Sequence, residues 1–214
     1  MRHALVVVGA LTVSSALAAG ARTTWTFDQD APGKPPAGFS FRHTGGIGRP
    51  GRWVVEAIKD APSGGRALGQ IDTDQTDGRY AMAVADQPSP KDLRLSVKCK
   101  PAAGTVDRAC GLVFRYRDEN NYYLARANAL EDNVRLYHVR NGKRTQLASW
   151  DGKVAANAWQ TIEVEAKGNL LRVSWSGKRV IEATDATFAE AGKVGLWTKA
   201  DSVTYFDDLS VTSL

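Results

Sequence analysis

Short segments in which apolar and polar residues alternate recur from residue 24 to the C-terminal end of the 214-residue chain. Such alternation places successive side chains on opposite faces of a β-strand, with one face toward a core. The predicted strands span residues 24–28, 39–42, 52–58, 67–73, 79–84, 93–99, 110–117, 122–128, 133–140, 143–150, 160–166, 170–176, 178–183, 194–199 and 202–212. Only residues 187–191 have the pattern of a helical turn.

Dipeptides that favour tight turns separate several of these segments. Asn141-Gly142, Gly168-Asn169 and Ser176-Gly177 supply residues that adopt the positive φ angles of two-residue hairpins. Many short strands joined by hairpins, without a long amphipathic helix, indicate an all-β fold. With 43% hydrophobic residues, the chain suits one sizeable core. We therefore expect a single domain, residues 22–214, built as a two-sheet antiparallel jelly-roll sandwich.

One segment has a composition that conflicts with its surroundings. Residues 124–131, Leu-Ala-Arg-Ala-Asn-Ala-Leu-Glu, are typical of a helix, but they lie between a turn at residues 118–121 and the Asn141-Gly142 hairpin. That space holds either an isolated two-turn helix or a strand. Tyr122 and Tyr123 favour the strand, because aromatic residues are enriched in β-structure.

Polar side chains gather on one predicted face of three consecutive strands. If the apolar positions of each strand face the core, alternation places six residues on the outer side. They are Arg115, Arg126, Asn128, Asn133, Arg135 and Tyr137. Guanidinium and amide groups bind vicinal hydroxyls through paired hydrogen bonds, and arginines also bind carboxylate, sulfate or phosphate. The face is therefore a candidate sugar-binding surface. The alternative is an exposed face whose side chains pair with nearby acids, namely Glu131, Asp132, Glu163 or Glu165.

Most of the six tryptophans are expected in the core, because a sandwich needs large inward-facing residues. Trp150 shares the parity of Arg144 and Gln146, so it is the tryptophan expected to be exposed and placed to stack on a sugar. His138 shares the parity of its apolar neighbours, which favours a position at the edge of the core.

Sequence signatures of common catalytic sites are missing. The chain carries no G-x-S-x-G elbow, no H-E-x-x-H motif and no C-x-x-C pair. The E-x-D-x-x-E pattern of sandwich glucanases is also missing, and Glu163 with Glu165 is expected to form a solvated strand face. Asp28 and Asp207, on the first and last strands, are candidates for a structural calcium site, with turn-forming aspartates as the alternative. No other cofactor is expected.

The N-terminal 21 residues have the pattern of a secretory signal peptide. Arg2 and His3 precede an uncharged apolar stretch that ends in small-residue cleavage patterns at Ala18 and Ala21. The rest of the chain has no uncharged run long enough to span a membrane. We therefore expect a periplasmic or secreted protein.

The two cysteines agree with export. Cys99 and Cys110 flank a segment with Pro101 and Gly104 that is typical of a hairpin loop. A disulfide would clamp the neck of this loop, and two buried free thiols are the alternative. The formal net charge of +5 is dispersed along the chain, with no run of five basic residues, so nucleic acid is not an expected partner. We expect a monomer.

Several motifs together resemble secreted bacterial concanavalin A-like (laminin-G-like) jelly-roll domains. They are Trp53-Val54-Val55, Gly111-Leu112-Val113-Phe114-Arg115, Asn121-Tyr122-Tyr123, residues 126–131 with Asn133 and Leu136-Tyr137, and Gly195-Leu196-Trp197 followed by Phe206-Asp207-Asp208. The likeness includes the 3-keto-disaccharide hydrolase domains, which are related to glycoside hydrolase family 16. It implies two curved sheets with a concave surface that faces carbohydrate. Because the acid triad of family 16 is missing, no catalytic residue is assigned.

Three hypotheses of function follow. The first is an exported lectin-like domain that binds a glycan, including anionic ones, through its concave sheet. The second is a hydrolase that acts on 3-keto-glycosides. The third is a cell-envelope module whose sheet contacts another protein.

Overall fold

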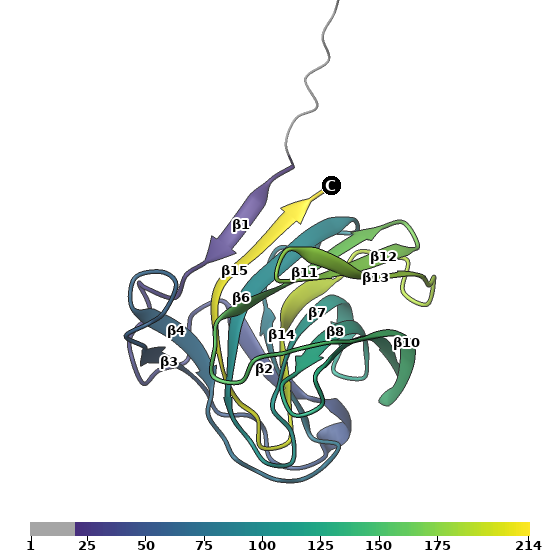
Figure 1. The fold of residues 1–214 in the computed structure, drawn as a ribbon. Coiled ribbons are helices and arrows are strands. Elements are labelled where there is room, and N and C mark those ends of the chain that lie inside the picture. Colours follow the sequence, from purple (N-terminus) through teal and green to yellow (C-terminus); the bar gives the residue numbers. More distant parts are fainter. Residues whose placement is uncertain (1–19) are drawn as a thin grey trace, which may run out of the picture.

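The computed structural model of the protein describes residues 20–214 (Figure 1). The predicted signal peptide, residues 1–21, lies outside the described residues apart from Gly20 and Ala21. The described chain forms fifteen strands in two antiparallel sheets and one short 3-10 turn, η1, at Thr44–Gly46. Within these residues, no helix has the length and apolar character needed to cross a membrane.

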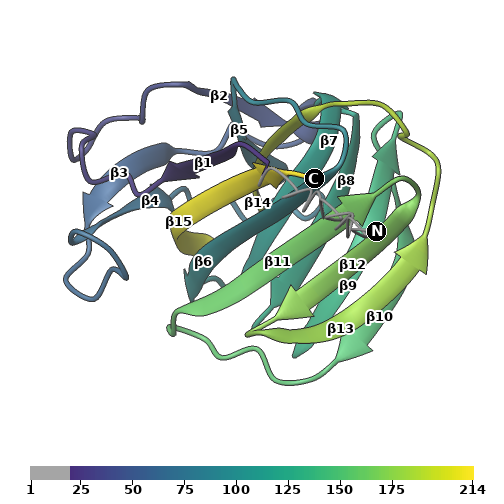
Figure 2. The same ribbon diagram turned by 90° about the horizontal axis from the view of Figure 1, so that it is seen from above.

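The first sheet has eight strands and forms one layer of the sandwich (Figure 2). Its order is β13 (Lys178–Thr184), β12 (Leu170–Trp175), β11 (Gln160–Lys167), β6 (Leu93–Ala103), β15 (Val203–Ser213), β4 (Arg66–Gln70) and β3 (Trp53–Ala57), with β1 (Arg22–Trp25) also paired to β15. Buried and partly exposed residues alternate along β6 and β11. This sheet therefore buries one face and presents the other to solvent.

The second sheet has seven strands. Its order is β10 (Lys143–Asp151), β9 (Asn133–Arg140), β8 (Asn121–Asn128), β7 (Ala109–Asp118), β14 (Lys193–Lys199), β5 (Tyr80–Ala85) and β2 (Phe39–His43). The three predicted hairpins are confirmed: they join β9 to β10, β11 to β12, and β12 to β13. Asn141 and Gly142 both have positive φ angles, 51° and 75°, as a tight hairpin requires.

The main core lies between the two layers. Val97 and Val164 from the eight-stranded sheet and Leu112, Phe114 and Tyr123 from the seven-stranded sheet are fully buried in it. Burial of large apolar side chains between two antiparallel sheets is the main stabilising contribution in such a sandwich. The predicted all-β jelly-roll sandwich is confirmed.

The segment with a helical composition is a strand. Residues 121–128 form β8, which pairs with β7 and β9 along its length. The strand ends where the Asn128 side-chain oxygen accepts hydrogen bonds from the backbone N–H groups of Leu130 and Glu131, at 2.8 and 3.2 Å. Pairing on both sides overrides the local helix propensity of the alanines.

The predicted helical turn at residues 187–191 is wrong. This segment has no helical hydrogen bonding and forms a bent connection before β14. Phe188 is buried in the main core, and its ring lies edge-on to Tyr123 at 5.2 Å between centroids. Packing of this one aromatic side chain explains the path of the connection.

The disulfide between Cys99 and Cys110 is confirmed, but its setting differs from the predicted hairpin. Cys99 lies on β6 and Cys110 lies on β7, and these strands belong to different sheets. Both residues are fully buried. The disulfide therefore fastens the two layers to each other across one end of the core.

The seven-stranded sheet is unusual because both of its faces are buried near its centre. A second apolar cluster lies on its outer face and includes Val113, Tyr122, Leu124 and Trp197, all fully buried. Part of the cover comes from η1, where the Thr44 hydroxyl lies 2.7 Å from the Tyr122 hydroxyl. This outer face holds five of the six predicted ligand-binding residues.

Candidate functional site

Five of the six predicted site residues lie together on the outer face of the seven-stranded sheet. Arg126 on β8 is directly opposite Arg135 on β9, and Asn128 is opposite Asn133. Tyr137 is two residues beyond Arg135 on the same face. We call these five residues, together with Glu131, Asp107 and Lys199, the Arg126 cluster.

The predicted face is not the open wall that alternation alone suggested. Arg126 is only 3% exposed, Asn133 2% and Tyr137 5%. Curvature of the sheet explains the burial. Arg144 on β10 lies 4.6 Å from the Tyr137 ring centroid and 4.9 Å from that of Tyr80 on β5, although four strands separate β10 from β5. The sheet must curl strongly for this contact to form, so its outer face is concave.

Arg126 is the centre of a hydrogen-bonded network. Its two terminal nitrogens donate to Glu131 Oε2 at 3.2 and 3.1 Å, and Nη2 also donates to the Tyr137 hydroxyl at 3.2 Å. Asn133 Nδ2 donates to the same Glu131 oxygen at 3.0 Å. Burial alone would raise the pKa of Glu131, but the Asn133 hydrogen bond and the Arg126 charge outweigh it, so the pKa falls below 4.5. Glu131 is therefore an ionised acceptor at neutral pH.

A second carboxylate lies beneath this network. Asp107 is 1% exposed, accepts a hydrogen bond from Asn128 Nδ2 at 3.0 Å and lies 3.1 Å from Lys199 Nζ. Burial raises the pKa of Asp107, against the opposing charge of Lys199. Asp201 holds the loop that carries Asp107, because its carboxylate accepts three backbone N–H groups of residues 105–107 at 2.7 to 3.2 Å. Sequence patterns gave no signal for this loop contact.

Buried polar atoms without a hydrogen-bond partner are concentrated on the concave face. Among residues 20–214, nine buried side-chain nitrogen or oxygen atoms lack a protein partner. Four of them lie on this face, namely Arg126 Nε, Asn133 Oδ1, Arg135 Nε and Arg144 Nη1. Because an unpaired buried polar atom is costly, this concentration makes the concave face the candidate functional site.

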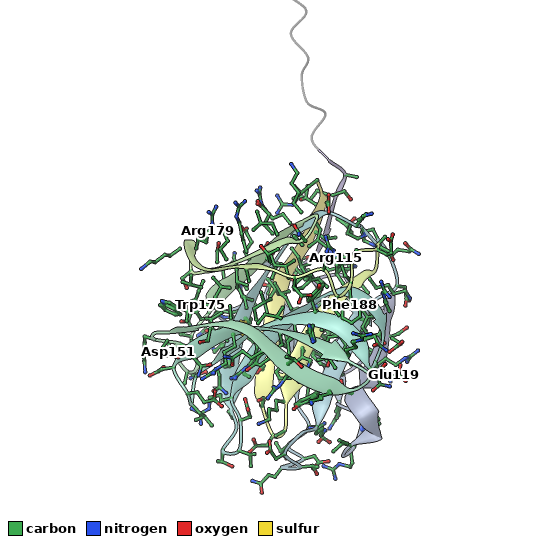
Figure 3. All side chains as sticks on the ribbon, turned by 90° about the vertical axis from the view of Figure 1, so that its right-hand side faces the viewer. Arg115, Glu119, Asp151, Trp175, Arg179 and Phe188 are labelled. Atoms are coloured by element: carbon green, nitrogen blue, oxygen red, sulfur yellow. A yellow bond between two sulfur atoms is a disulfide. The ribbon has the colours of Figure 1, made fainter. Side chains whose placement is uncertain are left out.

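Arg115 does not belong to the Arg126 cluster, and its predicted place on the shared face is wrong. The pairing of β7 with both neighbours shifts register around it, and its φ angle is 46°. Its fully buried side chain donates to the carbonyls of Lys91, Phe188 and Gly168 at 2.8 to 3.0 Å and pairs with Asp92 at 3.2 Å (Figure 3). Arg115 fastens three connections at one end of the sandwich.

Trp150 faces the core and is not the exposed stacking residue that its parity predicted. A bulge between Gln146 and Ala148 shifts the register of β10, so Trp150 lies opposite the core residue Val134. The extra residue reverses the faces of every position that follows it. Gln146, before the bulge, stays on the concave face and accepts a hydrogen bond from Arg135 at 2.8 Å.

Two other expectations are confirmed. Glu165 lies on the solvent face of the eight-stranded sheet and pairs with Arg94 at 2.6 Å and with Arg172 at 2.9 Å. His138 is partly buried at the edge of the core, with Nδ1 3.2 Å from the Thr187 hydroxyl. The alternative interpretation of the polar face also holds in part, because Arg126 does pair with Glu131.

The candidate calcium residues lie near one loop. Ser63 donates its backbone N–H and hydroxyl to the Asp207 carboxylate at 2.9 to 3.0 Å, and a Cβ at Gly64 would lie 2.0 Å from Asp28 Oδ1. Asp28 Oδ1 is buried without a partner. In the described part of the chain, however, no group of three or more Asp, Glu, His or Cys side chains is arranged to hold a metal ion. Calcium therefore stays a prediction.

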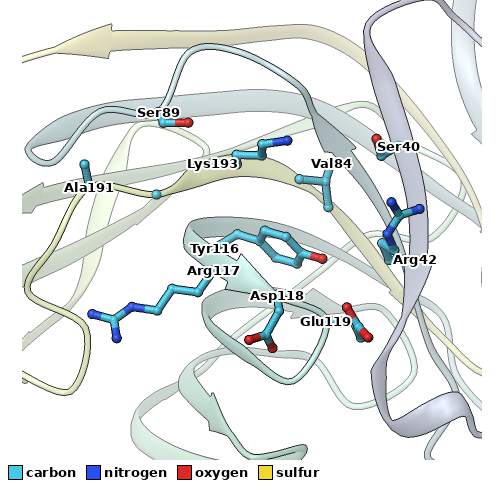
Figure 4. Close-up of a pocket in the computed structure, with 11 residues that line it drawn as sticks. Ser40, Arg42, Val84, Ser89, Tyr116, Arg117, Asp118, Glu119, Ala191 and Lys193 are labelled. Carbon is cyan, nitrogen blue, oxygen red and sulfur yellow. The ribbon is translucent and has the colours of Figure 1, made fainter.

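Sequence patterns missed a pocket of about 500 Å³ at the other end of the concave face (Figure 4). Tyr116 of β7 and Val84 of β5 form its floor, and its rim carries charged side chains from three segments. We call it the Tyr116 pocket. Val84 is four residues from Tyr80 on β5, so the pocket lies about 13 Å along the strand from the Tyr80 end of the face.

No protein-family model matches the chain. A levanase of Bacillus subtilis (strain 168) is 32% identical over 89 residues, which are 41% of this chain and 13% of the levanase. The similarity thus covers a small part of that enzyme.

Solved structures share the fold over most of both chains. Carbohydrate-binding module CBM66 from Bacillus subtilis has a TM-score of 0.64 at 22% identity, covering 82% of this chain and 96% of the module. The β-glucanase of Bacillus licheniformis has a TM-score of 0.57 at 14% identity, covering 91% and 99%. At these identities the similarity is one of fold. The chain therefore has the jelly-roll fold of the concanavalin A-like proteins, as its motifs indicated.

Proposed function

We propose that the domain binds carbohydrate through the concave face of the seven-stranded sheet, with the Arg126 cluster as its recognition site. The observation that carries the proposal is the concentration of buried, unpartnered polar atoms around Arg126. In a stable sandwich, apolar residues at these positions would cost less free energy than unpaired guanidinium and amide groups. Their presence is accounted for by a ligand rich in hydroxyl groups.

The chemistry of the face matches such a ligand. A sugar hydroxyl both donates and accepts, so it pairs with the guanidinium donors of Arg126 and Arg135 and with the ionised carboxylate of Glu131. The rings of Tyr80 and Tyr137 hold Arg144 between them, and Arg144 Nη1, which has no protein partner, adds a guanidinium donor for sugar hydroxyls. The similarity to a carbohydrate-binding module and to part of a levanase supports a glycan ligand. Levan is accordingly the first probe to use.

The predicted export supports the same proposal. We propose that residues 1–21 are removed and that residues 22–214 act outside the cytoplasm, in the periplasm or beyond it, as a monomer. The buried disulfide between Cys99 and Cys110 fits an oxidising compartment. Fractionation of cells that express the full chain tests this point, since a cytoplasmic, uncleaved protein would contradict it.

A hydrolase is the second candidate function. The observation that favours it is a pair of carboxyl groups on one face whose pKa values shift in opposite directions. The pKa of Asp107 is raised and that of Glu131 is lowered, as in a pair that supplies one acid and one base. Against it, Asn128 and Lys199 already occupy the Asp107 carboxylate. Release of reducing sugar from glycosides, including 3-keto-glycosides, by the wild-type protein and not by Asp107→Asn would favour this candidate.

We propose calcium only as a structural ion that would stabilise the fold near Asp28 and Asp207, with no part in sugar binding. Calcium takes six to eight oxygen ligands, so Asp28 and Asp207 would need backbone carbonyls or water beside them. The partnerless Asp28 Oδ1 supports a cation there. A melting temperature that rises with calcium in the wild type and not in Asp28→Asn would support it, and equal shifts would contradict it.

A glycan array followed by titration calorimetry tests the main proposal. Wild type is compared with Arg126→Met, and Arg94→Met is the matched control because Arg94 pairs with Glu165 on the opposite, solvated sheet. We expect selective binding by wild type and control, and binding at least ten times weaker in Arg126→Met, since a charge-assisted hydrogen bond contributes about 1.5–3 kcal/mol. Absence of binding to every glycan would contradict the proposal.

A further inference from the structure

The Tyr116 pocket lies at one end of the concave sheet, where the pairing of β7 with its neighbours is irregular. The pairing of β7 with β14 shifts register between Lys193 and Gly195, and the pairing of β7 with β8 shifts after Phe114. Arg115, at the centre of these shifts, turns its side chain away into the connections beneath. Gly192 packs against the Arg115 backbone so closely that a Cβ there would lie 2.5 Å from the Arg115 carbonyl carbon. The wall of the pocket is therefore held by backbone packing.

The floor of the pocket is apolar with one polar group. The Tyr116 side chain is 8% exposed, and Val84 beside it is 1% exposed. Burial raises the pKa of Tyr116 to about 12, with a contribution from the nearby Glu119 charge, so its hydroxyl stays protonated. A ligand ring lying on this floor meets an aromatic surface and a hydrogen-bond donor.

The rim carries both positive and negative side chains. Arg42 and Lys193 come from β2 and β14, and Glu119 follows the end of β7 (Figure 4). Arg42 donates only to the carbonyl of its own neighbour, Phe41, and within residues 20–214 no ion pair engages Arg42 or Glu119. These two side chains are therefore available to a ligand.

We propose that the Tyr116 pocket is a second subsite for a neutral sugar residue of the glycan that the Arg126 cluster binds. Guanidinium donors and a carboxylate acceptor around an aromatic floor complement a ring that presents vicinal hydroxyls. Asp118 and Glu119 balance the charges of Arg42 and Lys193, and Arg117, also in the lining, is held over the Phe188 ring at 5.1 Å, so the rim offers no excess positive charge to phosphate or sulfate. Both sites lie on one concave face, so a single oligosaccharide chain is placed to reach from one to the other.

This inference rests on the proposed function and adds a prediction about ligand length. Isothermal titrations compare a levan-derived monosaccharide with long levan oligosaccharides, and β-glucan oligosaccharides are run in parallel. The variants are Arg42→Ala and Glu119→Gln in the pocket, Arg126→Met in the cluster, and Glu163→Gln on the solvated sheet as control. Melting temperatures verify that the exposed pocket variants remain folded.

We expect the pocket variants to bind long oligosaccharides at least five times more weakly than wild type while their affinity for the monosaccharide stays unchanged. Amide resonances of Val84 and Tyr116 should shift only with the long ligands. If the pocket variants bind every oligosaccharide like wild type while Arg126→Met loses binding, the inference is wrong and the proposed function stands. If no sugar binds the wild type, both are wrong.

Discussion

The outer faces of the two sheets differ in how far their side chains are exposed to solvent. On the eight-stranded sheet, outward charges such as Arg94, Glu165 and Arg172 pair with each other in solvent. On the seven-stranded sheet, β7 and β8 are buried on both sides, and Arg126 on the concave outer face is only 3% exposed. Apolar and polar residues alternate along β6, whereas residues 109–114 of β7 form an unbroken run of apolar or small residues, so the sequence of the central strands and the curvature of the sheet together separate the two outer faces.

The difference separates charges that solvent satisfies from charges that the fold leaves incompletely paired. Exposed ion pairs on a solvated sheet contribute little to folding and need no further explanation. A buried guanidinium with an unpartnered nitrogen does need one, because desolvation without full hydrogen bonding destabilises the fold. The four predictions that follow set residues of the concave sheet against matched residues elsewhere, beginning with the largest effect.

Arg115→Met should have the largest effect on stability. The substitution removes the donor to the buried Phe188 carbonyl, the donors to the part-buried carbonyls of Lys91 and Gly168, and the partner of Asp92, and loss of this set of contacts costs about 3–5 kcal/mol. Urea unfolding followed by tryptophan fluorescence measures the loss. Arg179→Met, which removes an exposed arginine paired with Glu182, is the control and should change stability by less than about 0.5 kcal/mol. Similar values for the two variants would contradict the structural role of Arg115.

Replacing both cysteines should have the next largest effect. The disulfide joins β6 to β7 across the two sheets, and its loss is expected to reduce the free energy of unfolding by about 2–4 kcal/mol. The Cys99→Ala/Cys110→Ala variant and the reduced wild type should lose similar amounts in chemical denaturation. A fully stable variant would mean that the main core alone holds the layers together.

Much of the fold was predictable from local patterns. Alternation located the strands, and Asn141-Gly142 and Ser176-Gly177 marked hairpins whose positive φ angles the structure contains. The aromatic start of β8 correctly outweighed its alanines. Grouping of Arg126 with Asn133 on one face also followed from period-two geometry alone.

What the sequence did not reveal came from irregular pairing and from curvature. Bulges reversed the faces of Arg115 and Trp150, and assignment of faces by a constant period of two assumes that a strand contains no extra residue. The disulfide between sheets looked like a hairpin clamp, because sequence distance does not tell which sheet a strand joins. Burial of the Arg126 cluster depends on how strongly the whole sheet curls, which no single strand encodes.

Arg126→Met should leave stability unchanged or raise it, in contrast to Arg115→Met. Both arginines are buried in the same sheet, but only Arg126 has an unpartnered Nε, and its partner Glu131 reaches solvent. Replacing a whole buried ion pair by apolar side chains is often neutral or stabilising, and because the Glu131 carboxylate stays hydrated when its partner is removed, we expect Arg126→Met to come within about 2 kcal/mol of that behaviour. The same urea experiment measures this difference. A loss of stability as large as that of Arg115→Met would place Arg126 among the structural residues.

Protonation of Glu131 should give the smallest change in the free energy of unfolding, and the change should be a loss of stability. Its folded-state pKa lies below the ordinary 4.5, so its contribution to stability is present above pH 4.5 and is lost as pH falls through the folded-state value. Glu131→Gln should therefore approach wild-type stability only below pH 4.5. Asp107, whose pKa is raised mainly by burial and in smaller part by the Glu131 charge, acts in the opposite direction and is common to both proteins, so most of its effect cancels in their difference. Melting curves from pH 3 to pH 7 provide the measurement, and parallel curves would contradict the assignment.

The most direct test of the concave-face site is the affinity of one glycan, the tightest found on an array, for three proteins at neutral pH. We expect equal dissociation constants for wild type and Arg94→Met. For Arg126→Met, which keeps its fold, we expect a dissociation constant at least ten times larger. Equal affinity in all three proteins would show that carbohydrate, if bound, is recognised elsewhere on the molecule.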